Sequence, residues 1–178
     1  MIFTPTPLVG SFTIDVERRE DERGFFARTF CVEEFAAHAL RSDFQQSSIS
    51  FNSRTGTLRG LHYQAAPHAE TKLVRVTHGA VFDVIVDLRP ASPTFKRWFG
   101  VELTALNRRA LYIPEGFAHG FQTLTDDAEV VYQITPVYVP EAARGARWDD
   151  PAFAITWPAV KQRIISLRDA EFADFVAD

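Results

Sequence analysis

Short strand-like segments separated by turn residues fill residues 71–134, and this pattern constrains the fold more than any other feature of the chain. The segments are 71–77, 80–88, 95–103, 109–113, 118–124 and 129–134, and the turns between them include His78-Gly79, Pro114-Glu115-Gly116 and Asp126-Asp127. Regular short strands with such turns indicate a β-sandwich or barrel. The His78-Gly79 turn predicts that the first two segments form a hairpin.

Helices are expected to be few. Residues 32–41 have helical composition with Glu33 and Glu34 in the first turn, and residues 169–176 are predicted to form a short terminal helix. A chain of 178 residues matches one domain with a sizeable core, and no repeat, linker or low-complexity tract divides it. We therefore expect a single domain over residues 1–178.

Charge and composition exclude several classes of partner. The net charge of −4 argues against non-specific binding to nucleic acid or to an anionic membrane, so a site for an anion needs a local basic cluster. No run reaches the length of a transmembrane helix, and residues 1–10 do not resemble a signal peptide. The single cysteine, Cys31, cannot form an internal disulfide, so we expect a cytoplasmic protein. The 16 phenylalanines predict aromatic packing inside a barrel or at an interface.

The segment 57–64, Thr-Leu-Arg-Gly-Leu-His-Tyr-Gln, places a cation and a histidine inside a strand-like run. Packing does not require Arg59 or His62 there, and burying a charge is costly unless it is paired. In a regular strand these two residues would face opposite sides. A bulge at Gly60 would bring both into one pocket. A lone strand histidine is otherwise more often structural.

Three further residues are candidates for chemistry. His119 follows a Pro-Glu-Gly turn and lies between small residues and phenylalanines. On pattern alone, the favoured explanation of Lys72 is a solvated strand end, and that of Tyr132 is ordinary aromatic packing in a strand. A metal site is not expected, because His62 lacks a second histidine at His-x-His spacing and Arg59 and Lys72 add positive charge.

Taken together, the motifs resemble the dTDP-4-dehydrorhamnose 3,5-epimerase family of nucleotide-sugar epimerases, over nearly the whole chain. Single motifs are unspecific, but their order and spacing are highly specific. The matching segments are residues 23–26, 56–64, 72–76, 83–89, 92–94, 113–121, Tyr132, Tyr138, 144–145, 148–151 and 165–169.

The resemblance implies a mainly β, double-stranded β-helix (jelly-roll, cupin-like) fold, a homodimer, and no metal or organic cofactor. It implies that His62 is the general base paired with Asp169, and that Tyr132 is the acid on the opposite face of the sugar. It also implies the following contacts to substrate: Lys72 and His119 to the carbonyl or enolate, Arg59 to the diphosphate or sugar, Arg23, Phe25 and Gln46 to the nucleotide, partly from the neighbouring subunit, and Tyr138 near the base.

The chemistry explains these residue types. In a 4-keto sugar, the hydrogens on carbons 3 and 5 flank a carbonyl. Removing one requires a base that works near neutral pH, such as histidine, with a carboxylate to orient it. The enolate oxygen requires a donor or cation such as Lys72. Inversion requires a proton from the other face, which a phenol such as Tyr132 can deliver.

Three of the positions expected to bind substrate depart from the family pattern. Arg28 stands where the family usually has glutamate, Ser48 where asparagine is frequent, and Arg168 where lysine is usual. Because arginine cannot accept a hydrogen bond, Arg28 suits the acceptor edge of cytosine or guanine rather than the imide of thymine. The alternative is that Arg28 is solvated and another residue reads thymine.

We therefore expect an isomerase that inverts carbon 3, carbon 5 or both of a nucleotide-linked 4-keto-6-deoxy sugar, in deoxysugar biosynthesis. The alternatives are a single-centre epimerase on a CDP- or GDP-linked sugar, a 4-keto to 3-keto isomerase, and a non-catalytic sugar-nucleotide-binding module. A metal-dependent barrel enzyme is disfavoured by the missing ligands.

Overall fold

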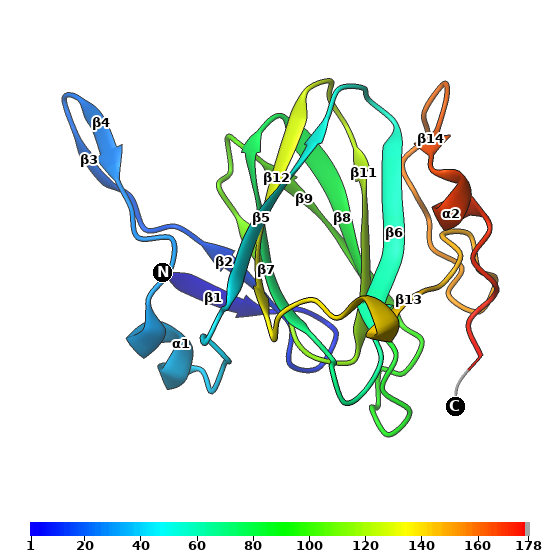
Figure 1. Ribbon diagram of the computed structural model, residues 1–178. Coiled ribbons are helices and arrows are strands. Elements are labelled where there is room, and N and C mark those ends of the chain that lie inside the picture. The colour runs from blue at the N-terminus through cyan, green and yellow to red at the C-terminus, as the bar shows by residue number, and fades with distance from the viewer. Residues whose placement is uncertain (177–178) are drawn as a thin grey trace.

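Two facing β-sheets form the body of the protein, as the computed structural model shows for residues 1–176 (Figure 1). The first sheet has the spatial order β1 (Ile2–Pro5), β2 (Phe12–Asp15), β10 (Ala110–Ile113), β7 (Thr71–His78), β12 (Ala128–Thr135) and β5 (Gln46–Asn52). The second has the order β13 (Ala143–Gly145), β6 (Thr57–Gln64), β11 (Phe117–Thr123), β8 (Ala80–Asp87) and β9 (Trp98–Thr104). The mainly β, jelly-roll architecture is thus confirmed.

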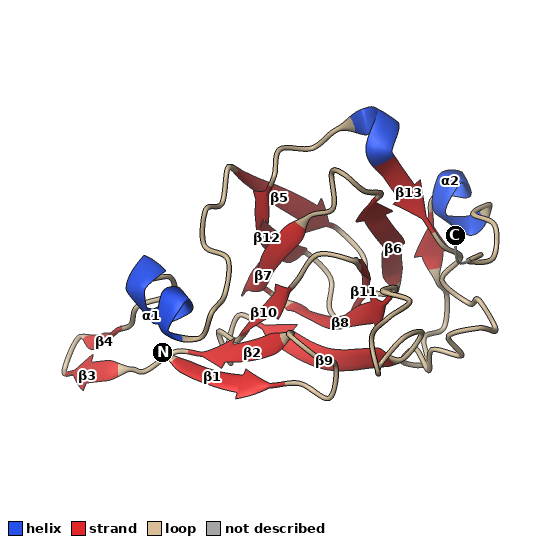
Figure 2. Ribbon diagram, turned by 90° about the horizontal axis from the view of Figure 1, so that it is seen from below, coloured by secondary structure: helices blue, strands red, loops and turns tan. Residues whose placement is uncertain are grey.

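Smaller elements surround this body. The hairpin of β3 (Arg19–Asp21) and β4 (Gly24–Phe26) projects away from the sheets, and α1 (Val32–Ala37) lies beside β1 and β2 (Figures 1 and 2). On the other side, β14 (Ile164–Ile165) pairs in parallel with β6, and α2 (Leu167–Ala170) follows it. A 3₁₀ turn, Pro140–Ala142, precedes β13. Residues 177 and 178, part of the expected domain, lie outside the described residues.

The predicted hairpin between segments 71–77 and 80–88 is wrong. β7 pairs with β10 and β12 in the first sheet, whereas β8 pairs with β9 and β11 in the second. Gly79, with φ +72°, therefore turns the chain between two sheets rather than within one. A turn dipeptide reports that the chain changes direction, but not which sheet the next strand joins.

The predicted helices also differ at their ends. Helix α1 stops at Ala37, four residues before the predicted end, and Ala39 adopts a φ of +55° that no α-helix continues. The terminal helix spans 167–170 instead of 169–176, because the Ser166 hydroxyl accepts a hydrogen bond from the Asp169 amide and caps its start. The strand predicted over 95–103 begins at Trp98.

Alternation along each strand separates a dry core from a polar end of the interior. In β7, Val74 and Val76 belong to the core between the sheets, and Lys72 lies on the same face one step further on. In β11, Phe117 and Phe121 are core residues and His119 lies between them. The same face of a strand thus supplies both packing and functional side chains.

A β-bulge at Gly60 confirms the expectation for segment 57–64. On β11, His119 pairs with His62 and Phe121 pairs with Arg59, so two steps on β11 match three steps on β6. Gly60 has φ +119°, and a Cβ built there would lie 2.6 Å from the Gly120 Cα and 2.8 Å from the His119 carbonyl oxygen. Only glycine fits, and the bulge turns Arg59 toward the same side as His62.

We predict that Gly60→Ala lowers the free energy of unfolding by at least about 3 kcal/mol, because it adds a backbone clash to a strained φ. Gly24→Ala is the matched control: its φ is +132°, but nothing lies within 4 Å of the added Cβ. Its expected cost is about 1–2 kcal/mol. Urea denaturation of both variants measures the difference, and equal costs would contradict the bulge contact.

Candidate active site

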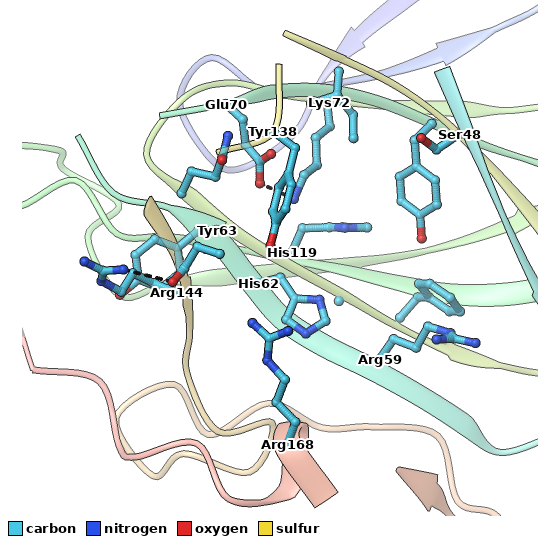
Figure 3. A pocket seen from close by; sticks show the side chains of 16 residues that line it. Ser48, Arg59, His62, Tyr63, Glu70, Lys72, His119, Tyr138, Arg144 and Arg168 are labelled. Atoms are coloured by element: carbon cyan, nitrogen blue, oxygen red, sulfur yellow. Dashed lines mark hydrogen bonds and ion pairs between the residues drawn. The ribbon is translucent and has the colours of Figure 1, made fainter. Parts of the chain in front are cut away.

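A cavity of about 310 Å³ opens between the two sheets at the polar end of the interior (Figure 3). It brings together eight of the residues predicted from the sequence, which come from strands of both sheets, from α2 and, for one of them, from the loop after β12. They are Ser48, Arg59, His62, Lys72, His119, Tyr132, Tyr138 (the loop residue) and Arg168. Asp169 lies behind His62. The cavity is also lined by Tyr63, Gln64, Glu70 and Arg144, to which no role was assigned from the sequence.

His62 and Asp169 form a hydrogen-bonded pair. The His62 Nε2 lies 2.9 Å from the Asp169 Oδ1, and the Gly60 amide donates to the Asp169 Oδ2 at 3.1 Å. Burial alone would raise the pKa of Asp169, but the hydrogen bonds from His62 and Gly60 outweigh it and lower that pKa. An ionised carboxylate only accepts, so the His62 Nε2 carries a proton, and in the neutral imidazole the lone pair is then on Nδ1.

Lys72 is buried, at 7% exposure, rather than solvated at a strand end. Its ammonium lies 2.7 Å from the Glu70 carboxylate, which is also buried and also lines the cavity. The ion pair compensates for the loss of hydration on both sides. Glu70 was missed because nothing in its sequence neighbourhood separates it from a loop carboxylate.

His119 has a carboxylate partner too. Its Nε2 lies 3.0 Å from both oxygens of Asp83, which is fully buried on β8, the strand next to β11. Asp83 holds the ring of His119 with one edge toward the cavity. The sequence offered one weak signal for it: a charged residue inside the apolar run 80–88.

Tyr132 faces His62 from the opposite sheet, since it lies on β12 and His62 lies on β6. Its ring meets the His119 ring edge-on, with centroids 6.0 Å apart. Burial, and then the nearby charge of Asp83, raise the pKa of its phenol. The phenol therefore keeps its proton at neutral pH. Tyr132 both packs against the core and lines the cavity, so the packing explanation was incomplete.

Cationic side chains from three elements lie at the cavity. Arg59 from β6 is held by a 2.7 Å hydrogen bond from its Nε to the Asn52 side-chain oxygen. Arg168 comes from α2 and Arg144 from β13 (Figure 3). This is the local basic cluster that an anionic ligand requires in a protein of net charge −4.

Four predicted ligand residues do not line this cavity. The Arg23 side chain is 84% exposed and pairs with Asp21 of its own hairpin. The guanidinium groups of Arg18 and Arg108 both contact the Phe25 ring, at 5.0 and 4.6 Å from its centroid. The other two residues bond to groups of the same chain: Arg28 donates to Glu34 at 2.9 Å, and the Gln46 side chain accepts a hydrogen bond from the Tyr138 amide.

Within residues 1–176, no three His, Cys, Asp or Glu side chains gather in a way that could hold a metal ion. In the same part of the chain, no helix is long and apolar enough to cross a membrane.

The pair of His62 and Asp169 has a consequence for acid stability. The folded-state pKa of Asp169 lies below the usual 3.8, so its stabilising bonds are present above about pH 4 and are lost as the pH falls further. Asp169→Asn removes one acceptor, because His62 and Gly60 donate to different carboxylate oxygens and the amide replaces one of these oxygens with an NH₂ group. We predict a loss of about 1–3 kcal/mol at neutral pH.

Urea denaturation over a pH series measures this. The gap between wild type and Asp169→Asn should narrow below about pH 4. Asp174→Asn, which alters a half-exposed carboxylate paired with Arg147, is the control and should stay close to wild type throughout. A gap that stays constant with pH would contradict the ionised pair.

Comparison with known proteins gives one consistent family. The family model described as dTDP-4-dehydrorhamnose 3,5-epimerase matches residues 5–176. The enzyme of that name from Shigella flexneri is 48% identical over 157 residues, covering 88% of this chain and 86% of its own.

Solved structures agree. An epimerase of the same name from Elizabethkingia anophelis has a TM-score of 0.95 at 37% identity, covering 98% of this chain and 96% of its own. A 3,5-epimerase from Legionella pneumophila in complex with dTDP-4-keto-L-rhamnose has a TM-score of 0.91 at 39% identity, covering 97% and 92%.

A single-centre relative shares the fold as well. A 3'-monoepimerase from Streptomyces bikiniensis, in complex with dTDP-quinovose, has a TM-score of 0.88 at 31% identity, covering 96% of this chain and 86% of its own. The fold alone therefore does not decide how many centres are inverted. Because the family model matches almost the whole length of the chain, the chain belongs to the dTDP-4-dehydrorhamnose 3,5-epimerase family of isomerases.

Proposed function

We propose that this protein inverts carbons 3 and 5 of a dTDP-linked 4-keto-6-deoxy sugar, with His62 as base and Tyr132 as acid. One observation carries the assignment of roles: a carboxylate-paired histidine and a protonated phenol enter one cavity from opposite sheets. The names of the relatives and the bound dTDP-sugar of the Legionella enzyme support the substrate.

The first step is removal of a proton next to the ketone. The His62 Nδ1 takes the proton from carbon, and the electrons of the C–H bond move to the carbonyl oxygen to give an enolate. Asp169 stabilises the imidazolium that forms. Lys72 supplies positive charge to the enolate oxygen, and His119, oriented by Asp83, supplies a second polar contact. Glu70 and Asp83 hold these two groups in place.

The second step returns a proton from the other face. The Tyr132 phenol, whose pKa is raised by burial, is protonated and can donate to the carbanionic carbon as the enolate collapses to the ketone. The configuration of that carbon is inverted. His62 then carries the proton that it took and Tyr132 has lost one, and exchange with solvent restores both for the next centre.

The diphosphate is proposed to lie against Arg59 and Arg168, where guanidinium groups suit phosphate oxygens. Ser48 and Tyr138 line the same cavity. Arg28 forms an ion pair with Glu34 of its own chain. This ion pair favours the interpretation in which Arg28 does not read the base. We therefore propose dTDP over the CDP- and GDP-linked alternatives.

A homodimer that shares its nucleotide site accounts for Arg23 and Phe25, two of the predicted ligand residues outside the cavity. The hairpin that carries Arg23 and Phe25 projects from the body, and Phe26 beside them is 71% exposed (Figure 1). The edge strand β5 exposes Ile49 and Phe51 by 65% and 56%, which leaves an apolar surface for a second copy. The proposed arrangement places the hairpin of one subunit at the cavity of its partner.

Incubation with dTDP-4-keto-6-deoxyglucose in deuterated water tests the reaction. We predict deuterium at carbons 3 and 5, with the inverted product. Incorporation at one carbon would instead establish the single-centre alternative, and incorporation at neither would overturn the proposal.

His62→Ala should reduce exchange by about a thousandfold or more while dTDP affinity changes little. Tyr132→Phe should reduce inversion more than exchange, because the base remains; equal losses would contradict the acid role.

Mixed subunits test the shared site. His62→Ala and the double variant Arg23→Ala/Phe25→Ala should each have little activity alone. When the two are refolded together, one site of each hybrid dimer combines an intact His62 with an intact hairpin, so activity should recover to about one quarter of wild type. If the hairpin serves its own subunit, mixing restores nothing. A mixture of wild type and His62→Ala, refolded in the same way, controls for the refolding yield and should keep about half of wild-type activity in either arrangement.

A further inference from the structure

The C-terminal segment reaches His62 with a second side chain besides Asp169. Phe172, three residues after Asp169, presents its ring edge-on to the His62 imidazole, with centroids 5.9 Å apart and an interplanar angle of 78°. Phe172 is not among the side chains that line the cavity. Its ring therefore contacts His62 from outside the set of side chains that line the cavity.

The ring occupies a place that the neighbouring strand leaves empty. Gly145 on β13 is the direct cross-strand partner of His62. A Cβ built on Gly145 would lie 2.2 Å from both Cε2 and Cζ of Phe172. In an antiparallel pair the side chains of opposing residues share one face. Phe172 thus takes the position next to His62 that a side chain at 145 would fill.

Several bonds hold the segment around Phe172 in this position. The Arg147 amide donates to the Ala173 carbonyl at 3.3 Å, and the Arg147 guanidinium pairs with Asp174 at 3.0 Å. The Phe175 amide donates to the buried Asp150 carboxylate at 2.5 Å. Before Phe172 in the chain, Asp169 accepts a hydrogen bond from the Gly60 amide. The backbone is therefore held in place both before and after Phe172.

We propose that Phe172 is a positioning residue for the base, and that Gly145 exists to admit its ring. This inference rests on the proposed function. The ring restricts His62 to the rotamer in which Nε2 meets Asp169, and it excludes water from that hydrogen bond. Nδ1 then points at the carbon to be deprotonated, and small errors in such a placement cost large factors in rate.

Four variants test the coupling. Phe172→Ala should lower kcat for exchange roughly ten- to hundredfold, with a much smaller change in KM. Phe172→Leu, which keeps an apolar filler, should recover most of this loss. Gly145→Ala should lower kcat by displacing the ring. The double variant Gly145→Ala/Phe172→Ala should be no slower than Phe172→Ala alone, because the displaced ring is already absent.

Leu167→Ala, on the exposed side of α2, is the control and should keep wild-type kcat. The ¹⁵N spectrum of the His62 imidazole gives a readout that needs no substrate: the Nε2–H tautomer in wild type, and an average of both tautomers in Phe172→Ala. Wild-type kcat and an unchanged imidazole in Phe172→Ala would overturn the inference, as would losses that multiply in the double variant. Absence of exchange in wild type would refute the proposed function instead, and the imidazole spectrum would still decide the role of Phe172.

Discussion

The close approach of two glycines, Gly60 and Gly120, determines the geometry of the whole site. A Cβ on Gly120 would lie 2.7 Å from the Arg59 carbonyl oxygen, just as one on Gly60 would meet Gly120 itself. With neither side chain present, β6 can bulge against β11. The bulge places Arg59 and His62 on one wall and leaves the Gly60 amide free to hold Asp169. The base, its partner and a neighbouring cation therefore depend on one backbone contact.

The remaining groups follow from strand alternation combined with charge pairing. Lys72, His119 and His62 lie on the interior face of their strands, where a dry core would place apolar residues. Lys72 and His119 are buried, and burying such groups unpaired is costly. Each has a carboxylate in reach: Glu70 for Lys72, Asp83 for His119 and Asp169 for His62. Within the part of the chain described, no buried side-chain nitrogen or oxygen lacks a hydrogen-bond partner. The polar end of the barrel is thus stable without substrate and already organised for it.

Local patterns in the sequence predicted much of the fold and part of the site. Alternating segments and turns gave six strands of the body, and the oddity of Arg59, Gly60 and His62 predicted the bulge. The same patterns failed where distant pairing decides, as in the corner at Gly79 that was taken for a hairpin. Asp169 was reached only through the resemblance to a family, since 107 residues separate it from His62. Glu70 and Asp83 escaped because their importance comes from a partner that the fold buries beside them: Lys72, two residues along the chain, for Glu70, and His119, on the neighbouring strand, for Asp83.

The central claim is that the two sheets present a base and an acid to opposite faces of one sugar ring. A crystal structure with dTDP-L-rhamnose, which lacks the reactive ketone, tests it most directly. The account predicts the sugar between the sheets, with the His62 Nδ1 and the Tyr132 Oη each within about 4 Å of carbon 3 or carbon 5 and on opposite faces of the ring. Both groups on the same face, or a sugar outside this cavity, would contradict it.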